Sequence, residues 1–528
     1  MKLTVNECML KNLNADVLVI PVFKDIENEE EIFVEMNNLL NKLLSQTIYE
    51  NKDIKEDGKF HLFYTNSRVK LKRILLVGLG RSDEIDAEKI RNLGGKLAGY
   101  CKSNSMKNVA FLGFGYSLKN IAIDDVSKAL IEGILLGNYS YEEFKTLDND
   151  GKSRNSERKS SKDSKSKGIE SFLIIPQVKS DKKLIDDVIK ETEIICRNVN
   201  IVRDLVNKPA NIINPTLYAK EIKKLFTKTK VSVKVLEEPQ IKKEKMNCIL
   251  GVAKGSVEKP KLVILNYTPP RAKKTIALVG KGVTFDSGGI NIKPSAYLTG
   301  MKGDMGGSAA VIGAIRSAAE LRLPIKIIGI MPLVENMPSG NALKTGDVLI
   351  ASNGKSIEVE NTDAEGRLIL ADALHYATKF KPDYIVDIAT LTGAAAIALG
   401  TRCSSLMGNE QDLVDALLKA GKETHDLAWQ LPLLKEYEDD IKGSITDIKN
   451  LGAAQGEAGT IIGGIFLRHF IGKNDKSRTY FENKEDNEYK WAHIDIGATS
   501  STSATRPYLE KGATGAPVRL LVKWLMGL

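Results

Sequence analysis

The sequence has little of what marks secreted, histidine-ligated or membrane proteins. It contains five cysteines among 528 residues, and they are far apart with no CxxC spacing. An odd number of widely spaced cysteines argues against a disulfide framework or a zinc knuckle, and it favours a reducing compartment. The cysteines are Cys8, Cys101, Cys196, Cys248 and Cys403.

Long apolar runs are also missing. The sequence has no run of about 18 apolar residues, so we expect no segment that spans a membrane. Its N-terminus reads as a strand, a polar break and a strand, without the apolar core and small-residue cleavage site of a secretory signal. These absences predict a cytoplasmic protein with no membrane partner.

Positive charge is concentrated in one segment. The formal net charge is +9, but residues 151–168 alone hold seven basic and two acidic residues and no apolar side chain. Such a segment cannot bury enough surface to offset its ordering entropy, so we expect a disordered Lys/Ser-rich insertion at about 146–168. A second polar stretch at 473–489 is expected to form another surface insertion. Because little net charge remains elsewhere, we do not expect a nucleic-acid partner.

What the chain does contain is a regular alternation of strand and helix patterns. In the first 180 residues this order predicts a mostly parallel sheet covered on both faces by helices. The Gly-Leu-Gly at 78–80 lacks a third glycine and a downstream acid, so it indicates a tight turn and not a nucleotide site. The strand patterns lie at 14–22, 73–80, 108–115 and 169–176, and the helical patterns at 84–103 and 125–139.

A long helical pattern separates this half from a larger second half, which again alternates strands and helices. We therefore predict an α/β protein with two domains, each a mostly parallel or mixed sheet flanked by helices, the C-terminal one being the larger. The expected parts are an N-terminal domain at 1–180, a linking helix at 181–209 and a C-terminal domain at 210–528, which the charged clusters described next indicate to be the catalytic one. Asn353 and Gly354 predict a type I′ hairpin between two antiparallel strands.

Charged residues of the second half gather where apolar strands end or a buried helix begins. Glycines flank each cluster and let the backbone approach a ligand closely. In open α/β sheets ligands bind outside the carboxyl ends of the strands, so we expect these side chains to converge. The clusters are Lys281, Asp286 and Lys293 in GKGVTFDSGGINIKP, Asp304 in MKGDMGG, and Asp363, Glu365 and Arg367 in ENTDAEGRLILADALHY.

Four carboxylates at one place repel one another unless cations neutralise them. None of the five histidines lies among these charged residues, and His375 comes about two turns of the expected helix after Arg367, which excludes a histidine-type zinc site there. Carboxylate-rich sites suit paired divalent metals, and four carboxylates balance the charge of two such ions. Lys281 would then bind metal only as a neutral amine, since an ammonium has no lone pair.

These clusters resemble the signatures of the leucyl aminopeptidase family of two-metal aminopeptidases. The resemblance is close from about residue 200 onward and weak before it. It implies a metal-dependent enzyme that removes leucine and other hydrophobic N-terminal residues from short peptides. The matching blocks are GKGVTFDSGG at 280–289, MKGDMGGSAA at 301–310, NTDAEGRL at 361–368, DIATLTGA at 387–394 and RPYLEKGATG at 506–515.

The resemblance also implies two metal sites, which would hold Zn²⁺ or Mn²⁺, with Co²⁺ and Mg²⁺ as further candidates. Asp286 and Glu365 would bridge the two ions. The residues that match the ligands of a tightly held ion are Lys281, Asp286, Asp304 and Glu365. Those that match the ligands of an exchangeable ion are Asp286, Asp363 and Glu365.

Two cationic residues match catalytic positions of the family. Lys293 matches a lysine that polarises the scissile carbonyl, and Arg367 matches an arginine that holds a bicarbonate ion acting as general base. The family's DIAG pattern reads Asp-Ile-Gly-Ala at 495–498 here, so the wall of the side-chain pocket is expected to differ. The implied bicarbonate site also includes Ala364, Gly366 and Leu368, and the implied substrate pocket is lined by Met301, Thr390, Leu391, Thr392, Gly393 and Gly497.

The family further implies a homohexamer, a dimer of trimers. Two other functions fit parts of the sequence. A two-metal phosphoesterase would use clustered carboxylates but gives no reason for a lysine ligand, and a hexameric DNA-binding architectural protein would use the basic insertion. Simpler structural roles are a helix-capping acid for Asp363 or Glu365, structural hydrogen bonds for Asp372 and His375, and a satisfied core histidine for His493.

Overall fold

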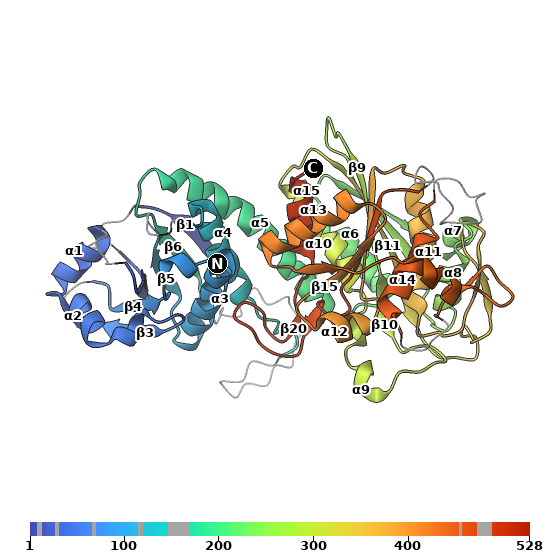
Figure 1. Cartoon of the computed structure of the whole chain (residues 1–528), viewed down its shortest axis with the longest axis horizontal. Coiled ribbons are helices and arrows are strands. Elements are labelled where there is room, and N and C mark those ends of the chain that lie inside the picture. Colours follow the sequence, from blue (N-terminus) through green and yellow to red (C-terminus); the bar gives the residue numbers. More distant parts are fainter. Residues whose placement is uncertain are drawn as a thin grey trace, which may run out of the picture. The chain divides into compact units, whose positions relative to one another are not determined.

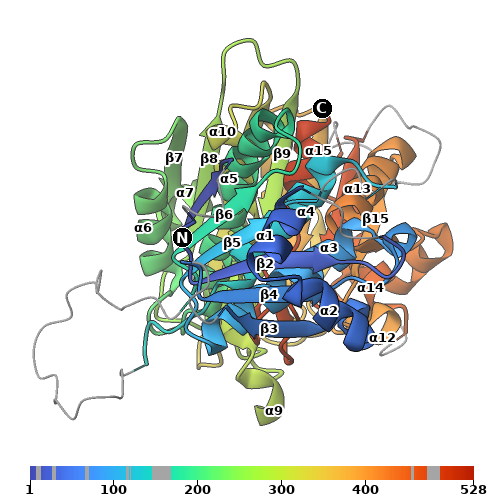
Figure 2. The same ribbon diagram turned by 90° about the vertical axis from the view of Figure 1, so that its left-hand side faces the viewer.

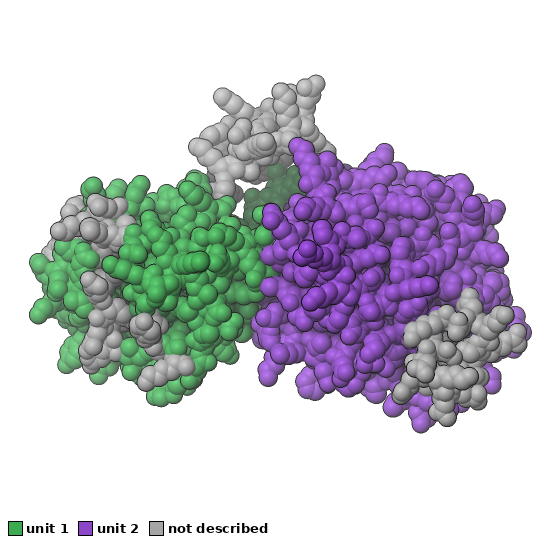
Figure 3. Space-filling view, turned by 90° about the horizontal axis from the view of Figure 1, so that it is seen from above, with its two compact units in different colours: residues 1–197, 504–510 green, residues 198–503, 511–528 purple. Residues whose placement is uncertain are grey.

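The computed structural model describes residues 1–7, 13–26, 31–65, 70–114, 118, 120–145, 168–452, 457–472 and 488–528. Nearly all of the two expected insertions, at about 146–168 and 473–489, lies outside these residues. The chain packs as two compact units (Figure 3). Unit 1 comprises Met1–Arg197 with Ala504–Glu510, and unit 2 comprises Asn198–Ser503 with Lys511–Leu528. The division falls inside the helix expected to link the domains.

Unit 1 is built on a mostly parallel sheet, as the strand and helix alternation predicted (Figure 1). In the described residues its order is β1-β6-β5-β2-β4-β3, and the edge strand β3 runs antiparallel to β4. Figure 2 shows these strands side by side. The strands are β1 (Lys2–Val5), β2 (Val17–Val22), β3 (Phe60–Tyr64), β4 (Arg73–Gly78), β5 (Asn108–Leu112) and β6 (Ser171–Ile175).

Helices cover both faces of this sheet, because successive side chains of a strand point to opposite faces. Val17 and Val19 of β2 belong to the core that includes the buried residues of α3 and α4. Leu18 and Ile20 belong to the core formed with α1 and α2. The helices of unit 1 are α1 (Glu31–Leu39), α2 (Leu43–Glu50), α3 (Ala87–Ser103), α4 (Ile123–Gly137) and the first part of α5 (Asp181–Asn207).

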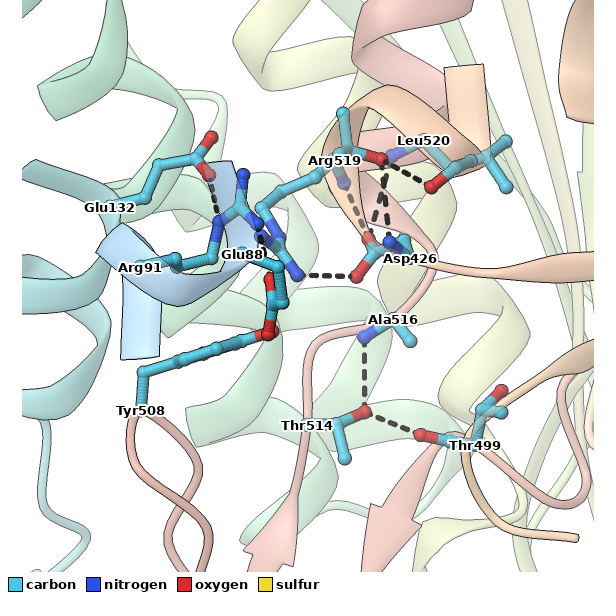
Figure 4. A network of polar contacts seen from close by, with 12 residues as sticks. Glu88, Arg91, Glu132, Asp426, Thr499, Tyr508, Thr514, Ala516, Arg519 and Leu520 are labelled. Carbon is cyan, nitrogen blue, oxygen red and sulfur yellow. Dashed lines mark hydrogen bonds and ion pairs between the residues drawn. The ribbon is translucent and has the colours of Figure 1, made fainter. Parts of the chain in front are cut away.

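The helices α3 and α4 approach each other closely through glycines. A Cβ on Gly133 would lie 2.1 Å from the carbonyl oxygen of Arg91, so no larger residue fits there. The Arg91 guanidinium is buried at this contact and pairs with Glu132 of α4 at 2.7 Å from its Nε (Figure 4). A buried pair of this kind fixes the two helices in one register.

The segment Ala504–Glu510 packs on α3, which explains why it belongs to unit 1 despite its place near the C-terminus. Tyr508 donates a hydrogen bond from its hydroxyl to Glu88 at 3.0 Å (Figure 4). A Cβ on Gly95 would meet the carbonyl oxygen of Pro507 at 2.2 Å, so glycine is required for this contact. Nothing in the apolar periodicity of the sequence signals it.

Unit 2 contains a mixed sheet, in the order β16-β15-β18-β14-β9-β11-β8-β7, with β10 paired to β11. The long central strand β11 runs parallel to β9 and β10 and antiparallel to β8. The strands of this sheet are β7 (Val231–Leu236), β8 (Lys261–Tyr267), β9 (Thr275–Gly280), β10 (Gly282–Asp286), β11 (Lys326–Asn336), β14 (Tyr384–Ala389), β15 (Ser404–Gly408), β16 (Ala428–Gln430) and β18 (Trp491–Asp495). Two-stranded pairing joins β19 (Ser501–Thr502) to β20 (Gly512–Ala513).

Helices also cover both faces of the unit 2 sheet. Val279 of β9 and Ile330 of β11 share a core with α8, α11 and α14. On the opposite face, a Cβ on Gly329 would touch Val311 and Ile315 of α10. The helices are α6 (Pro215–Leu225), α7 (Glu238–Lys243), α8 (Asn247–Ala253), α9 (Ser295–Leu298), α10 (Gly306–Glu320), α11 (Glu365–Thr378), α12 (Ala394–Leu399), α13 (Gln411–Thr424), α14 (Gly459–Arg468) and α15 (Val518–Met526).

The C-terminal helix α15 is tied to the end of α13. Arg519 donates to Asp426 both from its backbone N–H and from its guanidinium, the latter at 2.8 Å (Figure 4). Thr514 nearby bonds to the carbonyl of Thr499, which follows β18. None of the helices in the described ranges has the length and hydropathy that crossing a bilayer requires.

The Asn-Gly hairpin is present, but its turn differs from the prediction. Strands β12 (Val348–Ile350) and β13 (Ser356–Glu358) pair antiparallel, as expected. Gly354 has a φ of 91°, but Asn353 does not have a positive φ, so the type I′ turn predicted is wrong. The N–H of Gly354 bonds to the carbonyl of Ala351, whose own N–H bonds to Lys355. The connection is therefore a three-residue loop with glycine in the left-handed position.

Asp372 of α11 makes the structural hydrogen bonds predicted for it. Its buried carboxylate accepts backbone N–H groups from Cys248 and Ile249, at 2.9 and 3.1 Å, and from Ser352 at 2.8 Å. It thereby ties α11 to α8 and to the hairpin.

Replacing Asp372 by alanine is expected to lower the free energy of unfolding by about 3 kcal/mol or more, because three buried N–H groups lose their acceptor. Thermal unfolding measures the effect. Asp347→Ala, which removes a partly exposed carboxylate beside the same hairpin, is the matched control and should cost about 1 kcal/mol or less. Equal losses in the two variants would contradict a special role for Asp372.

Candidate metal centre

Lys281 stands at the corner between β9 and β10, where its backbone is hydrogen-bonded to β14 and to the start of α10. Its side chain is 3% exposed. The Nζ atom lies 2.8 Å from Asp304 Oδ2 and 2.9 Å from Glu365 Oε1, and it donates to the carbonyl of Thr390 at 2.9 Å. Lys281 thus joins two carboxylates that are far apart in the chain.

Asp286 is the last residue of strand β10, and hydrogen bonds fix one of its two carboxylate oxygens. Its Oδ1 accepts hydrogen bonds from the Gly288 N–H and from Asn336 Nδ2, both at 2.9 Å. Its Oδ2 faces Lys293 Nζ at 2.8 Å. The same Nζ lies 2.5 Å from Asp363 Oδ1, so Lys293 also bridges two carboxylates.

Asp304 follows a short helical turn, Met301–Gly303, that leads into α10. Its Oδ1 accepts a hydrogen bond from Thr390 Oγ1 at 2.7 Å. The neighbouring Lys302 donates to the carbonyl of Asn207 at 2.7 Å, at the end of α5. A cation at a helix C-terminus is favourable, so this contact anchors the turn that carries Asp304.

Asp363, Glu365 and Arg367 lie at the beginning of α11. The helix has Ala364 as its N-cap and no side-chain cap hydrogen bond, so helix capping does not explain the two acids. A Cβ on Gly366 would lie 2.7 Å from Lys281 Nζ, so glycine is needed to let this lysine reach Glu365.

Three of the carboxylates form one compact group. Asp286, Asp363 and Glu365 each offer an oxygen, and these atoms lie within 4.8 Å of one another. Asp304 adjoins the group through Lys281. The structure therefore brings all the predicted metal-ligating residues together, from the ends of β9 and β10, the turn before α10 and the first turn of α11.

Electrostatics show how crowded these carboxylates are. Burial raises the pKa of Glu365 to about 8, with Asp286 adding to the rise and Lys281 opposing it. Burial also raises the pKa of Asp304 to about 6, against the effect of Lys281. Burial alone would lower the pKa of Lys281, but Asp304, Glu365 and Asp286 outweigh it and raise it. The carboxylates therefore attract cations strongly.

The residues present fit hard divalent cations. All the acidic groups offer oxygen, the ligand atom that Mg²⁺ and Mn²⁺ prefer and that Zn²⁺ accepts. Glu365 Oε2 is buried and has no hydrogen-bond partner among the described residues, so a ligand-binding oxygen is left free. Metal binding would satisfy this oxygen and relieve the repulsion among the carboxylates.

Arg367 lies beside these acids and is 6% exposed. Burial lowers its pKa to about 10, while Glu365 and Asp495 act in the opposite direction, so it remains a cation at neutral pH. It donates to the carbonyl of Asn450 at 3.0 Å, and its Nε has no hydrogen-bond partner in the part of the chain that is described. With the free N–H groups of the first turn of α11, this cation offers a site for an anion.

Two of the residues predicted to line a substrate pocket, Met301 and Thr390, lie beside the carboxylates, and the others follow Thr390 directly in the chain or lie close to Thr392. Met301 is in the turn before Asp304, and Thr390 bonds to that aspartate and to Lys281. Leu391 and Thr392 follow β14, and a Cβ on Gly497 would lie 2.7 Å from the Thr392 carbonyl oxygen. Gly393 comes next and is the N-cap residue of α12.

Sequence reasoning missed two asparagines that hold the site. Asn336 Nδ2 donates to Asp286 and also to the carbonyl of Thr362 at 3.0 Å, so it links β10 to the segment before α11. Its place at the carboxyl end of an apolar strand is a signal that could have found it. Asn450 accepts from Arg367 through its backbone in a loop, and no sequence pattern points to it.

These features define a class of protein, an α/β enzyme with a carboxylate-rich centre for divalent cations at one edge of its sheet. The model for the cytosol aminopeptidase family, catalytic domain, matches residues 200–522, and the model for the N-terminal domain of the same family matches residues 19–147. The chain belongs to the cytosol aminopeptidase family and is a metal-dependent aminopeptidase. The resemblance predicted from the sequence is thereby confirmed.

Similar proteins span the whole chain. A probable cytosol aminopeptidase of Geobacter sp. is 40% identical over 510 residues, 96% of each chain. A probable cytosol aminopeptidase of Alkaliphilus metalliredigens is 34% identical over 522 residues, covering 99% of this chain and 98% of the relative. A solved mutant of tomato leucine aminopeptidase has a TM-score of 0.81 and 31% identity, covering 100% of this chain and 97% of its own. The bottromycin maturation enzyme BotP in complex with Mn has a TM-score of 0.79 and 27% identity, covering 97% of this chain and 99% of its own.

Proposed function

We propose that this aminopeptidase removes leucine and other hydrophobic N-terminal residues from short peptides by means of two divalent metal ions and a bicarbonate ion. The observation that carries the proposal is the convergence of Asp286, Asp363 and Glu365 within 4.8 Å, beside two lysines that bridge carboxylates. When bound, the two ions lower the pKa of the attacking water and anchor the free α-amino group of a peptide, which restricts cleavage to its first bond.

The ligands divide into two overlapping sets. We assign one ion to Lys281, Asp286, Asp304 and Glu365, and the other to Asp286, Asp363 and Glu365. Asp286 and Glu365 are shared. As long as no metal ions neutralise the carboxylates around it, Lys281 is an ammonium, because these carboxylates raise its pKa. Two divalent ions would balance the four acids and remove that effect, so the amine could then release its proton and offer its lone pair.

Lys293 supplies positive charge beside Asp286 and Asp363. Burial alone would lower its pKa, but the two carboxylates raise it, so Lys293 is protonated at neutral pH. An ammonium here can donate hydrogen bonds to the oxygen of the scissile carbonyl as that oxygen becomes an anion. Lys293 thus stabilises charge that is absent from the bound peptide.

Arg367 supports the proposed bicarbonate site with Ala364, Gly366 and Leu368. Its guanidinium is buried and carries charge, its Nε has no hydrogen-bond partner among the residues that the structure describes, and it lies at the N-terminus of a helix. Bicarbonate held there would accept the proton of the attacking water. The protein's part is to hold this base beside the metal centre and to exclude other orientations of it.

An activity assay on a panel of aminoacyl amides tests the proposal. The purified protein is stripped with a chelator, reloaded with Zn²⁺, Mn²⁺, Co²⁺ or Mg²⁺, and assayed in degassed buffer with and without bicarbonate. We expect metal-dependent release of leucine and other apolar residues, stimulated by bicarbonate. N-acetylated leucine amide is the matched control and should not be cleaved. Cleavage of the acetylated substrate, or equal rates for acidic and apolar residues, would contradict the proposal.

We also propose a homohexamer, arranged as a dimer of trimers. Support comes from exposed apolar side chains grouped on the loop of Lys293, where Ile290, Ile292 and Tyr297 are 47%, 61% and 65% exposed, and from Ile397 on α12, which is 90% exposed. Exposed apolar surface of this kind marks interaction sites.

Sedimentation at micromolar protein concentration is expected to show a particle of six 58.0 kDa chains, because such surface is buried by assembly. Ile397→Asp should shift the distribution toward smaller species, while Val257→Asp, at a side chain that is 93% exposed, serves as the control. A fully active monomer of the unmodified chain would refute the assembly.

A further inference from the structure

A row of buried polar side chains crosses unit 2 on the sheet face covered by α11 and α14. Asp387 of β14 and His493 of β18 are direct neighbours in parallel register, and neither has any exposed surface. His493 Nδ1 lies 2.6 Å from Asp387 Oδ1, and Trp491 Nε1 donates to Asp387 Oδ2 at 2.7 Å. The proposed chemistry uses none of these three residues, so their burial calls for another explanation.

The His493 ring is fixed from one side. Its Nε2 has no hydrogen-bond partner among the described residues, so the contact with Asp387 determines its orientation. The prediction of a satisfied core histidine is therefore confirmed for one ring nitrogen and not for the other. A short contact between a carboxylate and an imidazole is typical of a charge-assisted hydrogen bond.

The row continues to Asp495, two residues along β18 and hence on the same face of the sheet. Its buried carboxylate accepts the N–H groups of Leu391 at 3.1 Å and Gly497 at 2.9 Å, and the hydroxyl of Thr392 at 2.6 Å. These donors belong to the proposed substrate pocket. Both oxygens of Asp495 are used as acceptors, Oδ1 by the two N–H groups and Oδ2 by the Thr392 hydroxyl.

Acidic and basic side chains alternate along this row. His493 pairs with Asp387 and lies two residues before Asp495 on β18, and Arg367 of α11 interacts electrostatically with Asp495. Burial alone would lower the pKa of His493, but Asp387 and Asp495 outweigh burial and the repulsion from Arg367 and raise it. Strand β15 faces His493 with uncharged Met407, against which α14 places a glycine.

We propose that His493, held by Asp387, is a positioning residue. As an imidazolium it balances the Asp495 carboxylate, which fixes the Leu391–Thr392 segment beside the metal centre. The role rests on the proposed place of that segment in the substrate pocket. It predicts that substrate binding weakens when His493 loses its proton, although this ring touches neither substrate nor metal.

The test compares KM for leucine amide between the metal-loaded unmodified enzyme and His493→Asn across pH. Asparagine keeps a donor for Asp387 but carries no charge. We expect the variant's KM to be about ten-fold higher at about pH 6, and the ratio of the two KM values to fall toward one as the pH rises through the raised pKa of His493 and the unmodified enzyme loses the charge. The substrate amine titrates identically in both, so the ratio isolates His493.

Two further readouts separate positioning from packing. Bound metal should be unchanged in His493→Asn. A histidine whose pKa is higher in the folded state than in the unfolded state stabilises the fold at pH values below its unfolded-state pKa. This stabilisation is lost as the pH rises through its folded-state pKa. The Tm gap between the two proteins should therefore be widest at about pH 6 and narrow toward pH 10.

Control variants complete the experiment. His469→Asn alters another buried histidine paired with a carboxylate, Glu438 at 2.9 Å, and should leave the KM ratio near one at every pH. Asp387→Asn should reproduce His493→Asn, and the double variant should be no worse than either, since the two residues act as a unit. If His493→Asn fails to fold, Asp387→Asn carries the test.

The inference is overturned if the KM ratio does not change with pH, whether the ratio is raised or equal to one. Failure of the proposed function looks different. An unmodified enzyme that cleaves no leucine amide refutes that function, whereas the pH-dependent Tm gap continues to report the charge of His493.

Discussion

Replacing Lys293 by alanine is expected to lower kcat by about 10²–10³-fold and to change KM little. The reason lies in when its charge acts. Its ammonium bridges Asp286 and Asp363 beside the metal centre. We propose that it faces the carbonyl oxygen of the scissile bond, which gains negative charge only during the reaction. An interaction that forms only in the transition state raises kcat and not the affinity for the substrate.

Steady-state kinetics with leucine amide measures this effect, with metal analysis alongside, because Lys293 contacts two proposed ligands. Metal content should be unchanged. Lys344→Ala removes an exposed lysine elsewhere in unit 2 and should retain full activity. A higher KM with unchanged kcat in Lys293→Ala would show that the lysine serves binding, and the assignment would be wrong.

Replacing Glu365 by alanine is expected to deplete both metal ions and reduce activity to background. Glu365 is 1% exposed, pairs with Lys281 and belongs to the compact carboxylate group, so its loss affects both proposed ligand sets. Removing a charged ligand from a buried site also leaves Lys281 with one carboxylate fewer to balance it.

Asp363→Ala is the matched contrast for Glu365→Ala. Its side chain is more exposed and serves one proposed ion, so this variant should keep close to one equivalent of metal and lose the exchangeable one. Elemental analysis after gel filtration distinguishes the two. Two full equivalents of metal in Glu365→Ala would overturn the assignment of a shared ligand.

Much of this fold is readable from periodicity, because burial imposes it locally. Val17 to Val22 form an uninterrupted apolar strand, and the small residues of Gly306 to Glu320 form a helix that lies close against the sheet. Contacts between distant segments are not readable in this way. The docking of Ala504–Glu510 on α3 depends on Gly95 and Tyr508, which have no periodic signature.

The same difference applies to the site, whose charged residues can be recognised in the sequence and whose neutral residues cannot. Charges such as Asp286 and Glu365 stand out in the sequence because they interrupt apolar elements that are about to be buried, and their chemistry limits what they can bind. The neutral residues that orient them do not stand out. Asn336 and Asn450 act through an amide and a backbone carbonyl, which any loop contains. The turn type predicted at Asn353 is wrong because the Asn-Gly dipeptide alone does not determine the length of the loop.

The order of strands in unit 2 has a consequence for how the chain folds. Strand β14 lies between β9 and β18 in the sheet, and β9 is flanked by β14 and β11, so neighbours in space are distant in the chain. Parallel pairs of this kind close large loops and form slowly. Lys281 follows β9 and Glu365 begins α11, so the two residues meet only after segments that are distant in the chain have come together. Metal ions that bind there bind the folded state and not the unfolded chain. Their free concentration therefore contributes to the fraction of molecules that is folded.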